Sequence, residues 1–144
     1  MDTSIYTDPH QSLGFLLHQA AINWRRSLAK ELRAIGLTPV QFFMLGSTSR
    51  LTAEFGQAPM QRDIAENTLV DINVVSQVVR QLEKRGLLLR ARNQADRRAF
   101  RLLLSEDGRE TLRQAIQVVY QVDEEFFGTV TAKPVLAENL KMII

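Results

Sequence analysis

Apolar residues recur every three or four positions along most of the chain, which is the spacing of amphipathic helices. The first such segment covers residues 12–36 and ends at Gly36, a residue type that commonly ends helices. Its apolar surface is wider than one narrow stripe, which suggests packing against a second subunit. The motif Thr38-Pro39-Val40-Gln41 has the residues of a capping box with proline in the first turn, so it predicts a second helix. We expect that helix to end before Gly56 and a short third helix to cover residues 60–67.

Residues 71–104 have the most informative pattern. Asp71 is a suitable N-cap for a helix that ends at Gly86. Two short strands, 87–92 and 99–104, then flank a polar turn, which predicts a hairpin. The short helix before residue 71 and the helix after it are joined by a turn of three or four residues, the arrangement of a helix-turn-helix. Four apolar residues are expected on the inner face of the second of these helices: Ile72, Val75, Val79 and Leu82.

The C-terminal part of the chain predicts two more helices. Ser105 is a suitable cap for a long amphipathic helix that continues to Phe127, and Gly128 interrupts it. Lys133-Pro134 starts a last helix that reaches the end of the sequence. The 144 residues therefore predict one domain of mainly α class with a small β-hairpin.

Positive charge is concentrated between Arg80 and Arg101. This window contains eight Lys or Arg residues against Glu83 and Asp96, a net charge of +6, whereas the whole chain carries +2. The segments before and after it are both net negative. Positive charge gathered on one helix and one hairpin is most simply explained by a polyanionic partner.

The outer face of the 71–86 helix carries side chains that can recognise DNA in the major groove. Arg80 can bond guanine bidentately, and Gln77 and Asn73 can do the same for adenine. Ser76 and Gln81 flank this face and could bond phosphates, and Lys84 lies on the face itself. Taken alone, a polar helix face is more often only a solvated surface. The arginine-rich hairpin that follows makes DNA binding the better interpretation of this face.

The hairpin carries five arginines with one acidic residue, Asp96, to offset them. Such clustering costs self-repulsion unless an anion relieves it, and an arginine at the tip of a hairpin can enter the minor groove. We count Asp96 with the DNA-binding set because we expect it to pair with a neighbouring arginine and hold the turn in shape, without touching DNA itself. The five arginines are Arg90, Arg92, Arg97, Arg98 and Arg101.

Three motifs follow one another at a specific spacing: Leu82-Glu83-Lys84-Arg85-Gly86-Leu87 with Arg90 after it, then Asp96-Arg97-Arg98, then Leu104-Ser105-Glu106-Asp107-Gly108-Arg109. With these motifs in this order, nearly the whole chain resembles the MarR family of winged-helix transcriptional regulators. The resemblance covers about residue 13 to residue 144. Ser105 stands where that family usually has threonine, a conservative change for a cap.

The resemblance implies a single winged helix-turn-helix domain over residues 1–144. Its DNA-binding lobe would cover residues 38–104 with the wing at 87–104, and residues 12–36 and 105–144 would supply long N- and C-terminal dimerisation helices. The protein would be a homodimeric repressor that binds a pseudo-palindromic operator in double-stranded DNA. Arg98 would be the best candidate for the minor groove, with Arg92 and Arg97 contacting the backbone or the groove beside it.

The resemblance also implies that a small, often aromatic or anionic, ligand relieves repression. Five residues could line a cavity between the first two helices, although plain core packing is the more common role of aromatic residues at helical spacing. These candidates are Phe15, His18, Trp24, Phe42 and Phe43.

Several classes of function are disfavoured by composition. The absence of cysteine excludes disulfides, thiolate zinc sites and cysteine redox switches, and the two histidines have no spacing that suits a metal site. We find no pattern typical of an enzyme and expect no cofactor. The N-terminus lacks the features of a signal peptide, and no apolar run approaches the roughly 20 residues needed to span a bilayer, so we expect a cytoplasmic protein without a membrane partner. The alternative function is a winged-helix module that binds proteins and has lost DNA binding.

Overall fold

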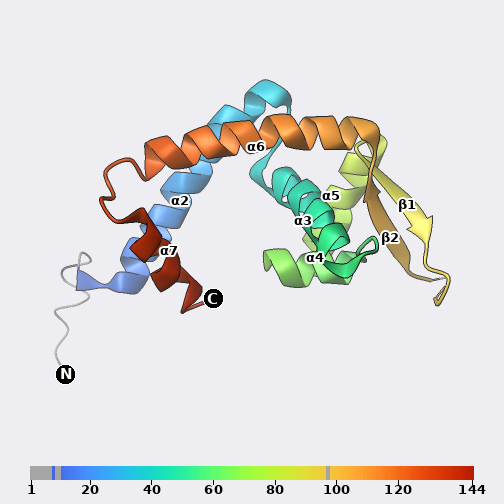
Figure 1. Ribbon diagram of the computed structural model, residues 1–144, viewed down its shortest axis with the longest axis horizontal. Helices are drawn as coiled ribbons and strands as arrows, with labels where there is room; N and C mark the ends of the chain where they lie inside the picture. The colour runs from blue at the N-terminus through green and yellow to red at the C-terminus, as the bar shows by residue number, and fades with distance from the viewer. Residues whose placement is uncertain (1–7, 9–10, 97) are drawn as a thin grey trace.

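The computed structural model describes residues 8, 11–96 and 98–144. In chain order its elements are α2 (Leu13–Leu32), the short 3-10 helix η2 (Arg33–Ile35), α3 (Pro39–Phe55), α4 (Gln61–Thr68), α5 (Ile72–Lys84), β1 (Leu88–Arg92), β2 (Phe100–Leu104), α6 (Glu106–Phe126) and α7 (Lys133–Lys141). The long α6 runs along one side of the molecule, with α2 and α7 near one end and α3, α4, α5 and the hairpin near the other (Figure 1). The mainly α fold with a small hairpin is confirmed.

Capping residues start the helices where the sequence predicts. Thr38 accepts a hydrogen bond from the backbone N–H of Gln41 at 3.2 Å, and the Gln41 side chain accepts one from the Thr38 N–H at 3.1 Å, which completes the capping box of α3. Asp71 caps α5 by accepting from the Asn73 N–H, and Ser105 caps α6 by accepting from the Gly108 N–H. These side chains satisfy N–H groups that a helix start otherwise leaves unpaired.

The core lies between α2, α3, α4, α5, the hairpin and α6. Helix α5 is rich in β-branched residues, which weakens its intrinsic helix propensity, so burial must hold it in place. Val75, Val79 and Leu82 of α5 are 0% exposed. The expectation that Ile72 also faces inward is wrong, since it is 44% exposed. It is the first residue of α5 and lies one turn before Val75, beyond the end of the packed core. The fully buried side chains of the other elements include Leu28, Leu32, Met44, Leu45, Ile64, Leu88 and Leu102.

The hairpin is one antiparallel pair whose register runs from Leu88 opposite Leu104 to Arg92 opposite Phe100. Each strand begins one residue later than the sequence suggests. The chain just before α4 lies along β2, because the Leu102 N–H donates to the Pro59 carbonyl at 2.8 Å and Met60 forms a bridge with Arg101. The start of α4 is therefore fixed against the hairpin.

A polar clamp ties the C-terminal end of α5 to the junction between α2 and α3. We define it as Gln41, Gln81, Arg85 and Gly36. The Gln41 side chain, 9% exposed as a residue, donates to Gln81 Oε1 at 3.2 Å and accepts from Arg85 Nη1 at 3.3 Å. Arg85 Nη1 also donates to the Gly36 carbonyl at 2.7 Å. Gly36 has a φ of 71°, and a Cβ there would lie 3.3 Å from the Arg85 guanidinium, so glycine suits both the helix end and the contact.

Apolar side chains remain exposed on the helices outside this core. No residue of α7 is buried, and the exposed fraction reaches 67% at Tyr120 of α6 and 93% at Ile144. No helix in the described part of the chain combines the length and the hydropathy needed to cross a membrane. The exposed apolar residues of the N-terminal half of α2 are Leu13, Phe15, Leu16, Leu17 and Ile22, and those of α6 and the C-terminal segment are Ile116, Tyr120, Val135, Met142, Ile143 and Ile144.

We predict that Gln41→Ala lowers the free energy of unfolding by about 1–3 kcal/mol, because it removes the hydrogen bonds that this buried side chain makes to Thr38, Gln81 and Arg85. Urea unfolding at fixed protein concentration measures the change. Gln57→Ala, at an exposed glutamine just after α3, is the matched control and should leave the midpoint nearly unchanged. Equal midpoints for the two variants would contradict the clamp.

Candidate nucleic-acid interface

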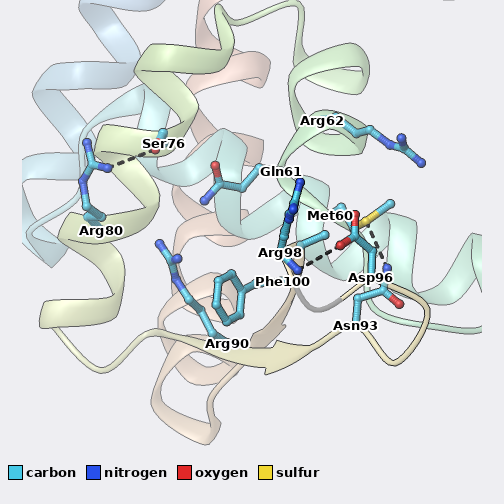
Figure 2. Close-up of a pocket in the computed structure, with 11 residues that line it drawn as sticks. Met60, Gln61, Arg62, Ser76, Arg80, Arg90, Asn93, Asp96, Arg98 and Phe100 are labelled. Atoms are coloured by element: carbon cyan, nitrogen blue, oxygen red, sulfur yellow. Dashed lines mark hydrogen bonds between the residues drawn. The ribbon is translucent and has the colours of Figure 1, made fainter.

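The outer face of α5 presents the polar side chains that the sequence places there. Asn73, Gln77, Arg80 and Lys84 are exposed, while Ser76 is half-buried at the edge of the face. Arg80 Nη1 donates to Ser76 Oγ at 3.1 Å, one helical turn away (Figure 2). Gln81 is exposed, but its side-chain oxygen already accepts the hydrogen bond from Gln41, so its amide N–H groups are what it can offer a phosphate.

An open cleft of about 480 Å³, here called the arginine cleft, separates α5 and the start of α4 from the hairpin (Figure 2). Four arginines from three parts of the chain border it, and Asp96 is the acidic residue in its lining. Arg62, on α4, lies far from the basic window of the sequence, and only the fold brings it here. The lining residues are Met60, Gln61, Arg62, Ser76, Arg80, Arg90, Asn93, Asp96, Arg98, Ala99 and Phe100.

The hairpin arginines divide into two groups. Arg90 pairs with Glu83 of α5, and its guanidinium lies 5.2 Å from the centre of the Phe100 ring. Arg101 donates to the Ala58 carbonyl at 2.6 Å. These two side chains therefore fasten the hairpin to its neighbours, and the carboxylate of Glu83 offsets the charge of Arg90 within the chain itself.

The remaining hairpin arginines lie toward the turn. Arg92 and Arg98 are exposed, and Arg98 borders the arginine cleft. Arg97 lies outside the described residues. Arg92 and Arg98 therefore place two exposed positive groups near the hairpin tip, where they can contact a phosphate backbone.

Asp96 holds the turn through the backbone. Its carboxylate accepts from the Arg98 N–H at 2.9 Å, and its carbonyl accepts from the Ala99 N–H at 3.1 Å. The expected pairing with an arginine side chain is not found among the described residues. Asn93, which is 8% exposed, supports the same turn by accepting from the Ala95 N–H at 3.1 Å. The burial of Asn93 could not be predicted from the sequence, in which this residue lies in a polar turn.

The five candidate ligand residues do not form one site. Phe42 and Phe43 line a second open cavity of about 330 Å³, here called the α3–α4 cavity, which Arg50 also borders. Phe15 and His18 contact each other, with ring centres 6.4 Å apart, on the N-terminal part of α2. Neither of them lines this cavity. The other lining residues are Gly46, Ser47, Asn67 and Thr68.

Trp24 lies beside the α3–α4 cavity without lining it. Its ring stacks on Phe43 with centres 6.2 Å apart and an interplanar angle of 11°. Its indole N–H donates to the Asp123 carboxylate of α6 at 2.7 Å. Trp24 thus joins α2 to both α3 and α6, and any movement of Phe43 would change its surroundings.

Comparisons with known proteins identify the family and the fold. The sequence pattern of the MarR family matches residues 37–100, which include α3, α4, α5 and β1. The HTH-type transcriptional regulator YdcH of Bacillus subtilis strain 168 is 36% identical over 141 residues, covering 98% of this chain and 95% of that protein.

Two solved structures show the same fold. A mutant of MarR from E. coli in complex with operator DNA superposes with a TM-score of 0.83 at 22% identity, covering 100% of this chain and 99% of that one. BpsR of Bordetella bronchiseptica, whose DNA binding is regulated by 6-hydroxynicotinic acid, gives a TM-score of 0.80 at 24% identity, covering 91% and 97%. The chain described here belongs to the MarR family of winged-helix transcriptional regulators.

Proposed function

We propose that this protein is a sequence-specific regulator that binds double-stranded DNA as a homodimer, represses transcription, and releases DNA when a small aromatic anion binds. The observation that carries DNA binding is the exposed polar face of α5 beside the arginine cleft. The similarity of the whole chain to MarR in complex with operator DNA supports the same surface.

Each part of the surface has a distinct role in this proposal. Helix α5 has 13 residues, and its outer face offers Asn73, Gln77 and Arg80 to base edges in the major groove. Ser76, Gln81 and Lys84 contact phosphates and set the position of the helix. Two such helices in a dimer would contact successive major grooves, roughly 34 Å apart, over a pseudo-palindrome.

The hairpin contacts the neighbouring minor groove. Arg98 is exposed at the edge of the arginine cleft and Arg92 is exposed on β1, so both can approach phosphates or a narrow groove. Asp96 shapes the turn that presents them. Arg97, outside the described residues, is assigned to the same set by its position in the sequence.

We predict that Arg80→Ala weakens binding to a cognate operator by about 1–3 kcal/mol and relaxes the preference at one base pair, because a bidentate base contact is lost. Arg98→Ala should weaken binding to all sequences and lower the slope of log affinity against log salt by about 0.9 for each phosphate contact removed. Fluorescence anisotropy at several salt concentrations, with operators selected from genomic fragments, measures both.

Arg113→Ala is the control for these two variants, since Arg113 is an exposed arginine on α6 that pairs with Glu110. It should bind DNA like the wild type. Unchanged operator affinity in both Arg80→Ala and Arg98→Ala would refute the assigned contacts. No binding to any duplex at low salt would favour the protein-interaction module instead.

Dimerisation is supported by the apolar surface that this chain leaves uncovered. The N-terminal half of α2, the outer side of α6 and the C-terminal segment all expose large apolar side chains. Large exposed apolar surface of this kind marks subunit interfaces in soluble proteins. Helices α2, α6 and α7 are therefore the proposed dimerisation elements.

We predict that the wild type sediments with the mass of two chains at micromolar concentration and that Leu17→Glu shifts it toward one chain. Leu17 is 47% exposed on α2, and an ionised carboxylate buried in an interface is strongly unfavourable. Phe55→Glu is the control, because Phe55 is 46% exposed at the end of α3, away from the proposed interface. A monomeric wild type would contradict the homodimer.

The α3–α4 cavity is the proposed ligand site. Phe42 and Phe43 supply apolar walls, and Arg50 supplies a positive charge at its border. Arg50 pairs with Glu54 at 3.5 Å on the surface, an interaction that a bound carboxylate could replace. The proposed ligand class is an aromatic carboxylate, the class of the 6-hydroxynicotinic acid that regulates BpsR.

We predict that 6-hydroxynicotinic acid or benzoate changes the fluorescence of Trp24, the single tryptophan, and weakens operator binding, whereas neutral benzamide does neither. The stacking of Trp24 on Phe43 makes its emission sensitive to the cavity. Arg50→Ala should weaken benzoate binding by about two- to five-fold, the scale of an exposed ion pair. Arg33→Ala, at another exposed arginine, should not. Identical responses to benzoate and benzamide would rule out recognition of the anion.

A further inference from the structure

Three apolar side chains at or just before the N-terminal end of α5 are exposed, although the rest of the helix buries its apolar residues well. Leu69 is 86% exposed, Ile72 44% and Val74 39%, whereas Val75 and Val79 are 0% exposed. We call Leu69, Ile72 and Val74 the apolar collar. They lie within six positions, from Leu69 at the end of α4 to the first turn of α5, where Asn73 also lies.

Leu69 is held in an unfavourable backbone conformation. Its φ of 57° makes it the one residue other than glycine with positive φ in the described part of the chain. A left-handed conformation costs free energy in a residue with a side chain, because the Cβ atom lies too close to the following carbonyl oxygen. Glycine fills this kind of position after α3 and after α5, at Gly56 and Gly86. Because the Leu69 side chain is almost fully exposed, packing within this chain does not offset that cost.

Val74 lies beside the base-contacting residues of α5. Successive residues of a helix are turned by about 100°, so Val74 and Ile72 lie on the two sides of Asn73. Val74 is also three residues before Gln77, which places it on the neighbouring surface of the same turn. When a recognition helix enters the major groove, residues at its N-terminal end come closest to the base edges.

The chemistry around the collar identifies what covers it. The collar adjoins the exposed polar face of α5 at Asn73, and Arg80 of the same face borders the arginine cleft. A partner that covers this face must therefore combine negative charge with an apolar group. In the major groove of DNA the apolar group is the C5 methyl of thymine. An apolar side chain that covers this methyl distinguishes thymine from cytosine without a hydrogen bond.

We propose that the apolar collar packs against thymine C5 methyl groups in the operator and that Val74 makes the contact that selects thymine next to the base pair contacted by Asn73 or Gln77. This assignment rests on the proposed DNA-binding function and adds a second kind of base recognition to it. The proposal requires a thymine within each half-site of the operator. This thymine must lie within one turn of the DNA helix from the bases that Asn73 and Gln77 contact.

The test separates the methyl group from the rest of the base. The wild-type protein selects its preferred duplex from a random library, and each thymine of that duplex is then replaced singly by uracil, which lacks only the methyl. At the contacted position we expect uracil to weaken wild-type binding about four-fold, which corresponds to the roughly 0.8 kcal/mol of one buried methyl. For Val74→Ala the thymine and uracil duplexes should bind equally at that position, and the two changes together form a double-mutant cycle.

Leu103→Ala is the matched control. Leu103 is 38% exposed, nearly the same as Val74, but it lies near the base of the hairpin opposite Leu89. This variant should keep the full uracil effect. Val74→Ala should stay folded, because the side chain is partly exposed and alanine has the higher helix propensity, and circular dichroism melting checks this.

Two results would overturn the inference while leaving DNA binding in place: a selected operator at which no thymine-to-uracil change weakens wild-type binding, or a uracil effect of equal size in wild type and Val74→Ala. Either result would mean that the collar does not pack against a thymine methyl group. A protein partner would then be the alternative occupant of this surface. A wild type that selects no sequence and binds no duplex would overturn the proposed function and this inference together.

Discussion

The orientation of α5 depends on how its C-terminal end is held. The Gln41 side chain is buried and bonds three groups at once: the start of its own helix, Gln81 of α5 and the guanidinium of Arg85. Arg85 in turn holds the carbonyl of Gly36, where α2 passes into α3. The α2–α3 junction and the C-terminal end of α5 therefore share one set of hydrogen bonds. With Val75, Val79 and Leu82 fully buried beside it, α5 has little freedom to turn about its axis, so the same side chains always face outward.

Charge on the hairpin has two different uses in the structure. Arg90 and Arg101 are bound to groups of the chain itself, the Glu83 carboxylate and the Ala58 carbonyl, so they hold the hairpin against α5 and the approach to α4. Arg92 and Arg98 are exposed. The first pair fastens the hairpin to its neighbours, and the second pair can meet an anion. A sum of charges along the sequence contains both kinds, so the +6 of this window overstates what is available to a partner.

Local signals in the sequence predicted most of the fold, because caps and helix ends depend on neighbours a few residues apart. Thr38 with Gln41, Asp71 and Ser105 begin their helices as expected. Contacts between distant segments could not be predicted this way. Arg62 joins the arginine cleft from α4, and Trp24 bonds Asp123 across 99 positions. Ile72 was misplaced because periodicity gives the face of a residue but not whether a neighbouring element covers the end of the helix. Periodicity also does not show which helices lie side by side, so Phe15 and His18 were placed in one candidate cavity with Phe42 and Phe43.

Two groups of exposed apolar side chains differ in their surroundings, and these surroundings distinguish the partners that fit them. On α2, α6 and the C-terminal segment they extend over several turns of long helices, as a protein interface that buries about 800 Å² on each side requires. At the start of α5 there are only three, and the polar residues Asn73 and Gln77 lie between and beside them. This surface is too small, and its apolar and polar side chains too closely mixed, to form the water-excluding core of a standard protein interface. It does match a groove floor on which single methyl groups alternate with hydrogen-bonding base edges. The same exposure thus points to a second copy of the chain in one place and to DNA in the other.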